Sequence, residues 1–226
     1  MYNMILANCD TDSISVCKRD GTEFSKEEQD KLINELNNLF PKRIRWEPDG
    51  IFPTVIVLAA KNYILFDGKK IKLKGSSLKD AKTEKALKEF KQKIIEAMVF
   101  DTNHYQDIYN AYIKEAMNVT DINRWSSKKT ISSKVLTSER TNEAKIRDAI
   151  EGSEYSEGDK AFVYFKSDGS LNLAEKFDGD YDRTRVLEKI FNTTKVFKNV
   201  IEPGTFINYK LKKNQKALEA ILGYQT

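Results

Sequence analysis

The chain has 226 residues, of which 40% are hydrophobic and 32% charged, and this composition is typical of a globular protein with one large domain or two small ones. No apolar run approaches the length of a membrane span, and the N-terminus lacks the basic region of a signal peptide. A membrane protein and a secreted protein are therefore not expected, and we expect a cytoplasmic location.

The first predicted element is a β-hairpin. Apolar residues run from Met4 to Ala7 and again from Ile14 to Val16, and they flank the turn-forming segment Asp10–Ser13. Alternation along the strands predicts a buried face made by Met4, Leu6, Ile14 and Val16. With the turn centred between Thr11 and Asp12, Cys17 faces Leu6 and lies roughly 10 Å from Cys9, too far for a disulfide. We therefore expect reduced thiols, as in an intracellular protein.

Two aspartates lie at the tip of this hairpin. Asp10 and Asp12 are two residues apart, a spacing at which an extended backbone can direct both side chains the same way. Adjacent carboxylates repel and tend to share a proton unless a divalent cation lies between them. Mg²⁺ is commonly held by one or two carboxylates together with substrate phosphates. An aspartate-rich turn is also common without any metal, so the segment alone leaves both interpretations open.

A helix and further strands follow. Ser25 and Glu28 have the spacing of a capping box, and the apolar residues up to Phe40 have helical spacing, so we expect a helix that ends at Pro41 and covers the sheet. The strands are expected at Arg43–Trp46, Thr54–Ala59, Asn62–Phe66 and Lys70–Lys74. In the last of these strands Lys70, Lys72 and Lys74 share one face, which suits phosphate contacts.

Positive charge is concentrated in one part of the chain. Residues 61–93 contain eleven lysines and four acidic residues, a local charge of +7, so the remainder carries about −3 of the total of +4. A solvated lysine-rich helix would explain this cluster, and so would a surface that follows a phosphate backbone. Its position beside the predicted aspartate hairpin favours the second explanation.

The second half of the chain is predicted to be mostly helical with a small β element. The helices are expected from Ser77 or Asp80 to about Phe100, from Asp101 or Thr102 to Ala116, at Asn142–Ile150 and at Asp180–Ile201. Strands are expected within Asn123–Leu136 and at Ala161–Phe165. Lys128, Lys129 and Lys134 in the first of these segments suit phosphate contacts, and an exposed strand without a ligand explains them equally well. The tyrosines near Tyr109 are expected in the core.

Three short motifs, in this order, resemble family B DNA polymerases. Residues 8–13 (N-C-D-T-D-S) resemble the Y-x-D-T-D-S hairpin, or C motif, of that family. Lys61-Asn62-Tyr63 resembles its K-x-Y element, and residues 72–77 resemble the lysine–glycine strand and serine turn that lead into the thumb. Asn8 and Ala60 depart from the family pattern without removing a proposed metal ligand, although Ala60 leaves one primer contact open.

The resemblance implies an α+β fold with two parts. Residues 1–78 would form the C-terminal part of a polymerase palm, with an antiparallel hairpin sheet and a covering helix. Residues 79–226 would form a mostly helical thumb with a small β element. The exonuclease domain, the fingers and the A and B motifs of the family lie upstream of the C motif, and only nine residues precede Asp10. The resemblance therefore implies a split subunit or a fragment that acts with an upstream polymerase chain.

The resemblance also implies roles for individual residues. Asp10 and Asp12 would be catalytic and would bind two Mg²⁺ ions shared with the upstream chain, and Thr11 would contact the incoming dNTP. Contacts with primer-template DNA would come from Lys61, Tyr63, Lys72, Lys74, Lys128, Lys129 and Lys134. The implied activity is that of a DNA-directed DNA polymerase.

Two other functions fit the same residues. The chain could be a non-catalytic DNA-binding accessory subunit with a vestigial D-T-D-S hairpin, or a structural domain with a fortuitous motif. The C-terminal segment 215–222 loosely resembles a sliding-clamp-binding peptide. An amphipathic terminal helix is the simpler interpretation of that segment.

Overall fold

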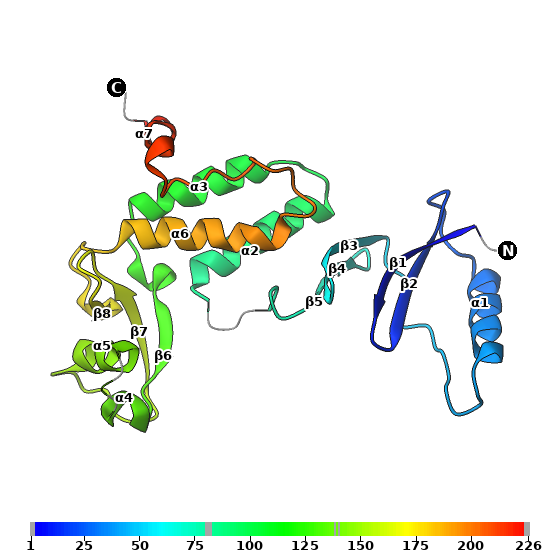
Figure 1. Cartoon of the computed structure of the whole chain (residues 1–226), viewed down its shortest axis with the longest axis horizontal. Helices are drawn as coiled ribbons and strands as arrows, with labels where there is room; N and C mark the ends of the chain where they lie inside the picture. Colours follow the sequence, from blue (N-terminus) through cyan, green and yellow to red (C-terminus); the bar gives the residue numbers. More distant parts are fainter. Residues whose placement is uncertain (1–2, 80–82, 138, 140, 224–226) are drawn as a thin grey trace. The chain divides into compact units, whose positions relative to one another are not determined.

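The computed structural model describes residues 3–79, 83–137, 139 and 141–223. The chain divides into two compact units, Met1–Lys79 and Asp80–Thr226. Each unit combines helices with small antiparallel sheets, which confirms the predicted α+β fold class (Figure 1). No helix in the described ranges is both long and apolar enough to span a membrane.

The first unit begins with the predicted hairpin, formed by β1 (Met4–Asp10) and β2 (Ser13–Lys18) around a turn at Thr11 and Asp12. The turn has the predicted centre, but the register shifts between Leu6 and Asn8. Because of this β-bulge, Cys17 lies opposite Ile5, and the prediction that it faces Leu6 is wrong by one residue. Both cysteines are free, as expected.

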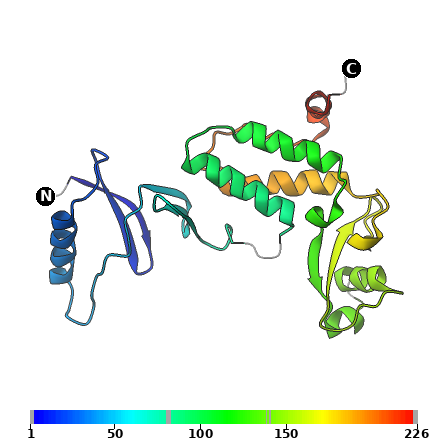
Figure 2. The ribbon, with the colours of Figure 1, turned by 180° about the vertical axis from the view of Figure 1, so that it is seen from behind.

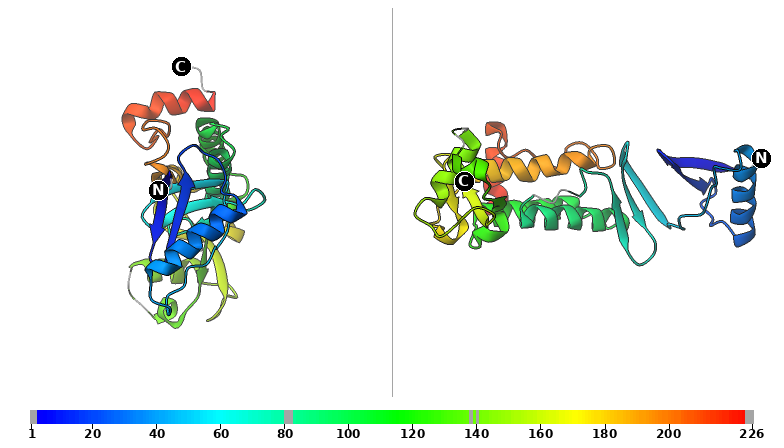
Figure 3. Two further views of the ribbon diagram at one scale, coloured as in Figure 1. Left: turned by 90° about the vertical axis from the view of Figure 1, so that its right-hand side faces the viewer. Right: turned by 90° about the horizontal axis from the view of Figure 1, so that it is seen from below.

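The predicted buried face of this hairpin is largely uncovered. Leu6 is 61% exposed, Ile14 is also exposed, and Met4 and Val16 are only half-buried. Alternation identifies a face of a hairpin, but burial also needs a neighbouring element that covers it. Helix α1 (Lys26–Leu39) begins with the predicted capping box and lies beside the hairpin, yet it contributes no buried residue (Figures 1 and 3).

A second sheet holds the core of this unit. Strands β3 (Thr54–Ala59), β4 (Asn62–Phe66) and β5 (Ile71–Lys74) are antiparallel and adjacent in that order, close to the ranges predicted from the sequence. Leu58, Ile64 and Leu65 are fully buried here. Such long apolar side chains contribute most to the stability of a small unit of this kind.

The prediction of a further strand at Arg43–Trp46 is wrong, because residues 41–53 form no regular strand or helix. The Asn37 side chain takes the place of a partner strand. Its Oδ1 accepts a hydrogen bond from the Trp46 N–H at 2.6 Å, and its Nδ2 donates to the Trp46 carbonyl at 3.0 Å. Pro41, Pro48 and Pro53 lack an N–H and disfavour a strand in this segment.

The second unit is built on three packed helices, α2 (Lys85–Val99), α3 (Tyr105–Met117) and α6 (Arg183–Thr194) (Figure 2). Tyr109 is buried among them, as predicted. The expected helix start at Ser77 is wrong, because Ser77 lies in a turn and α2 begins at Lys85. The alternative cap, Asp80, lies outside the described residues.

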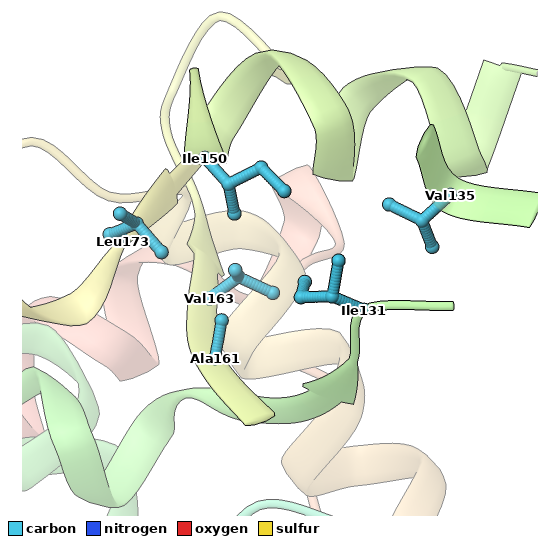
Figure 4. Close-up of a cluster of buried hydrophobic side chains, with 6 residues drawn as sticks. All are labelled: Ile131, Val135, Ile150, Ala161, Val163 and Leu173. Atoms are coloured by element: carbon cyan, nitrogen blue, oxygen red, sulfur yellow. The ribbon is translucent and has the colours of Figure 1, made fainter. Parts of the chain in front are cut away.

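A small sheet completes this unit, with β6 (Ser127–Thr130), β7 (Lys160–Phe165) and β8 (Leu171–Leu173) adjacent in that order. Helices α4 (Ser133–Thr137) and α5 (Thr141–Ile150) lie against it. Apolar residues of these helices, of the sheet and of the segment between β6 and α4 form one buried cluster, which Figure 4 shows: Ile131, Val135, Ile150, Ala161, Val163 and Leu173.

The remaining elements are short. Helix α7 (Gln215–Leu222) follows near the C-terminus and buries Leu218. The 3₁₀ turns are η1 (Ile122–Trp125), η2 (Ala174–Lys176), η3 (Lys195–Phe197) and η4 (Lys212–Asn214). Since η3 directly follows α6, the helix predicted as far as Ile201 ends at Thr194 and continues as tighter turns.

Candidate functional site

The tip of the first hairpin is a two-residue turn with unusual backbone geometry. Thr11 has a φ of 53°, a left-handed conformation that is rare for a β-branched residue. Asp10 ends β1 opposite Ser13, whose Oγ donates to the Asp10 main-chain oxygen at 3.1 Å. The Thr11 hydroxyl donates to Oδ1 of Asp10 at 3.2 Å. These contacts hold the half-buried Asp10, while Asp12 lies exposed in the turn.

Tyr63 connects this tip to the second sheet. Its hydroxyl donates to Oδ2 of Asp10 at 3.4 Å, a long hydrogen bond, and its side chain is 6% exposed. Burial raises the pKa of the Tyr63 phenol, and the negative charge of Asp10 raises it further. The structure thus brings together two residues that the sequence assigned to separate motifs.

Asp10 and Asp12 can supply only part of a metal site. No group of three or more acidic, histidine or cysteine side chains in the described residues could hold a metal ion. Two carboxylates are nevertheless a suitable donor set for Mg²⁺, which often takes its remaining ligands from phosphates, water or another chain. The residues at the tip therefore fit a magnesium site only if other groups complete it.

Lys61 lies in the tight turn between β3 and β4, directly before Tyr63's strand. Its φ is 60°, and its side chain is exposed. A Cβ added to Gly75 would lie 2.5 Å from the Lys61 carbonyl oxygen, so only glycine fits at this approach. Next to it, the Ser77 hydroxyl donates to Oδ1 of Asn62. The K-x-Y turn and the glycine–serine turn are therefore one packed structure. The motifs alone do not predict this contact, although Gly75 marks it.

Lys72 and Lys74 are both exposed on β5, but their surroundings differ. Lys74 lies opposite Tyr63 in the register, and Lys72 lies opposite Leu65, so these lysines share the Tyr63 face of the sheet. The Lys72 ammonium lies 3.6 Å from Asp67 Oδ2 and 5.1 Å from the centre of the Phe52 ring. Lys74 is therefore better placed than Lys72 to meet a ligand near Tyr63.

The other predicted DNA contacts belong to the second unit and do not form one surface. Lys128 and Lys129 are neighbours on β6, so they point to opposite faces of the sheet. Lys134 lies on helix α4, which corrects the prediction that it belongs to a strand. All three side chains are exposed.

A buried ion pair in the second unit was not foreseen from the sequence. The Glu84 carboxylate receives hydrogen bonds from the Lys189 ammonium and the Ser127 hydroxyl, and it joins α2, β6 and α6. Burial alone would raise the pKa of Glu84, but the Lys189 charge and these two hydrogen bonds outweigh it and hold the pKa below its ordinary value. The arrangement fixes the packing of the unit and leaves no free acid there.

The comparison of the sequence with known proteins finds no match to a family model or to a curated protein. The structure is similar to the family B DNA polymerase from the hyperthermophilic archaeon Pyrobaculum calidifontis, with a TM-score of 0.66 and 13% sequence identity. The match covers 88% of this chain and only 27% of that chain. At this identity the likeness concerns the fold, and it confirms at that level the resemblance carried by the three motifs. The chain has the fold of part of a family B DNA polymerase.

Proposed function

We propose that this chain is the C-terminal palm and thumb portion of a DNA-directed DNA polymerase. In this proposal residues 1–78 belong to the palm and residues 79–226 to the thumb. The observation that carries it is the Tyr63–Asp10 contact, because it joins the K-x-Y element to the D-T-D-S tip in a chain with a polymerase-like fold.

The aspartates and Thr11 would meet the substrates. Asp12, exposed in the turn, and Asp10 beside it would hold two Mg²⁺ ions shared with an upstream chain, and Thr11 would contact the incoming dNTP. When bound, the ions would lower the pKa of the primer 3′-hydroxyl and stabilise charge on the phosphates. The protein itself would contribute position and electrostatics, since phosphoryl transfer needs little covalent chemistry from side chains.

An upstream chain would supply the exonuclease domain, the fingers and the A and B motifs. The composition of the surface of the first unit supports such a partner. The buried apolar residues of its described part, 3–79, are Leu58, Tyr63, Ile64, Leu65 and Leu78, whereas Leu6, Leu39, Ile44 and Ile51 are each more than half exposed. Isolated hairpins with uncovered apolar faces are marginally stable, so a covering chain would stabilise this unit.

Primer-template DNA would lie against Lys61, Tyr63 and Lys74 near the metal site, with Lys72 and the lysines of the second unit as further contacts. For segment 215–222, the helix α7 with its buried Leu218 favours the amphipathic-helix interpretation. Binding of a sliding clamp by this segment therefore stays a prediction without structural support. The proposal includes a cytoplasmic location.

The non-catalytic accessory subunit is the competing function. It needs no metal, so the incomplete donor set at the tip within the described residues is as compatible with it as with a metal site shared with an upstream chain. Purification from the native source, followed by mass spectrometry, tests for the upstream chain. Metal-dependent nucleotide incorporation by the purified pair would support the polymerase, and DNA binding without incorporation would support the accessory subunit.

A further inference from the structure

One face of the small sheet in the second unit combines Lys128, a proposed DNA contact, with an aromatic residue to which the proposed function assigns no role. Lys128 lies opposite Phe162, and Thr130 lies opposite Lys160, so these four residues share one face of strands β6 and β7. We call this surface the β6–β7 face. Lys129 lies opposite Ala161 and belongs to the other face.

The two faces differ in what covers them. Ala161 and Val163 point into the buried cluster beneath α4 and α5 (Figure 4). Because side chains alternate along β7, Lys160 and Phe162 point away from that cluster. Phe162 is 42% exposed, and the Lys128 ammonium lies 5.7 Å from the centre of its ring. A partly exposed aromatic ring therefore lies at the surface with the Lys128 ammonium over it.

The lysines of this face also lack acidic partners. Neither Lys128 nor Lys160 forms an ion pair with any residue that the structure describes. The neighbouring Asp159 carboxylate accepts hydrogen bonds from the Ser156 N–H at 2.8 Å and the Ser156 hydroxyl at 2.9 Å, and it does not pair with Lys160. Asp178, farther along, pairs with Lys166 at 2.6 Å. The face therefore places two lysines outside any described ion pair next to a partly exposed ring.

We propose that the β6–β7 face binds a single-stranded segment of nucleic acid, with Phe162 stacking on an unpaired base and Lys128 and Lys160 contacting the adjoining phosphates. Exposed aromatic side chains flanked by lysines are the combination that binds single strands, because every unpaired base offers a flat face and every linkage a negative charge. The Thr130 hydroxyl can donate a further hydrogen bond to phosphate. A duplex hides its base faces in the stack and could use only the lysines. The inference rests on the proposed function for its choice of nucleic acid.

The test measures binding of a fluorescent oligothymidylate and of a blunt duplex of equal length to the full chain at several salt concentrations. Phe162→Ala should weaken oligothymidylate binding by about 5- to 150-fold, the range for loss of one stacking contact, and leave its salt dependence unchanged. It should leave duplex binding unchanged. The double substitution Lys128→Ala with Lys160→Ala should weaken the binding of both ligands. It should also reduce the salt dependence of oligothymidylate binding, expressed as the slope of log K against log salt concentration, by about 1.4, or about 0.7 for each phosphate.

Matched variants separate this contact from a change of fold or of total charge. Phe162→Tyr keeps a ring and should retain affinity for oligothymidylate. Lys129→Ala removes the same charge from the same strand on the other face, and it should weaken binding less than Lys128→Ala does. Photo-cross-linking with 5-iodouracil in the oligonucleotide should place the adduct on Phe162.

Equal loss of duplex and oligothymidylate affinity in Phe162→Ala would contradict stacking and indicate contact with a duplex. Equal effects of Lys128→Ala and Lys129→Ala, or an adduct only elsewhere, would contradict the assignment of the face. Neither measurement uses nucleotide incorporation or the upstream chain. The proposal for the β6–β7 face can therefore be refuted while the proposed polymerase function holds. Equally, the polymerase function can be refuted while the face still binds a single strand.

Discussion

The Tyr63 hydroxyl lies 3.4 Å from Oδ2 of Asp10, a contact between residues that are 53 positions apart in the chain. Asp10 ends a strand of the first hairpin, and Tyr63 lies in the central strand of the next sheet. The contact is long for a hydrogen bond, but Tyr63 is buried and Asp10 half-buried, so water screens the interaction only partly. It therefore links the geometry of the D-T-D-S tip to the position of the K-x-Y strand.

This contact predicts a change in the titration of Tyr63. Burial is the largest cause of its raised pKa and the charge of Asp10 is the next, so Asp10→Asn should lower the Tyr63 pKa toward the ordinary value of a tyrosine without reaching it. NMR titration of the Tyr63 ring carbon that bears the hydroxyl measures this pKa. Asp12→Asn serves as the control and should leave it unchanged. An Asp10→Asn variant with the unaltered Tyr63 pKa would show that the two groups do not interact in solution.

The sequence identified the hairpin, its turn and most strands of the first unit because these depend on local signals. The polar segment between Ala7 and Ile14 predicts a turn, and alternating residues predict strands. It did not reveal the β-bulge at Ala7, since a single extra residue has no sequence signature of its own. The predicted strand at Arg43–Trp46 failed for a related reason, because the Asn37 side chain replaces a partner strand from nine residues away.

The candidate site shows the same division between local and distant information. Motif resemblance indicated Asp10, Lys61 and Tyr63, but it could not show that Asp10 and Tyr63 touch. Nor could it show that Lys128 and Lys129, read as one basic run, point to opposite faces of a sheet. Contacts of this kind depend on register and packing, which a single sequence leaves undetermined.

Gly75 provides a test of the packed turns around Lys61. An alanine Cβ would lie 2.5 Å from the Lys61 carbonyl oxygen, and the residue has a φ of 108°, so Gly75→Ala should displace this backbone and weaken the adjoining sheet. Gly68→Ala is the control, because Gly68 has a φ of 85° and open space around it. Left-handed strain alone costs about 1–2 kcal/mol, and Gly75→Ala should exceed it. Hydrogen exchange of the amides of β4 measures the difference, and equal loss of protection in both variants would argue against the close approach.

The buried Glu84 predicts an acid-sensitive second unit. Its folded-state pKa lies below the ordinary value of 4.5, so its contribution to stability is present above that value and is lost as the pH falls through the lower folded-state pKa. Lys189→Met, which leaves the carboxylate buried without its partner, should destabilise the unit by about 3 kcal/mol at neutral pH. Denaturation followed by tryptophan fluorescence in a Trp46→Phe background, where Trp125 is the remaining tryptophan, measures both effects. Lys195→Met, a substitution near the end of the same helix, is the control and should have little effect on stability.

Lys61 should contribute one phosphate contact to primer-template binding. Its exposed side chain lies on the turn next to Tyr63, so Lys61→Ala should weaken binding and lower the salt slope by about 0.9. Lys26→Ala, on helix α1 where Lys26 pairs with Asp30, is the matched control and should leave the slope nearly unchanged. Binding isotherms at several salt concentrations provide the slope. The same slope for Lys61→Ala and the unaltered chain would remove Lys61 from the proposed DNA surface.

Asp12 gives the most direct test of the catalytic proposal. It lies exposed at the hairpin tip, where an added amide should cause little disturbance of the fold, so Asp12→Asn should abolish nucleotide incorporation by the chain combined with its upstream partner. DNA binding should stay nearly intact, because the substitution removes no positive charge. Asp30→Asn, which removes an exposed carboxylate from α1, should retain incorporation. Primer extension at limiting Mg²⁺ measures the activity, and filter binding measures the affinity for DNA. Since an accessory subunit needs no metal ligand here, full activity of Asp12→Asn would refute the catalytic assignment and favour that alternative.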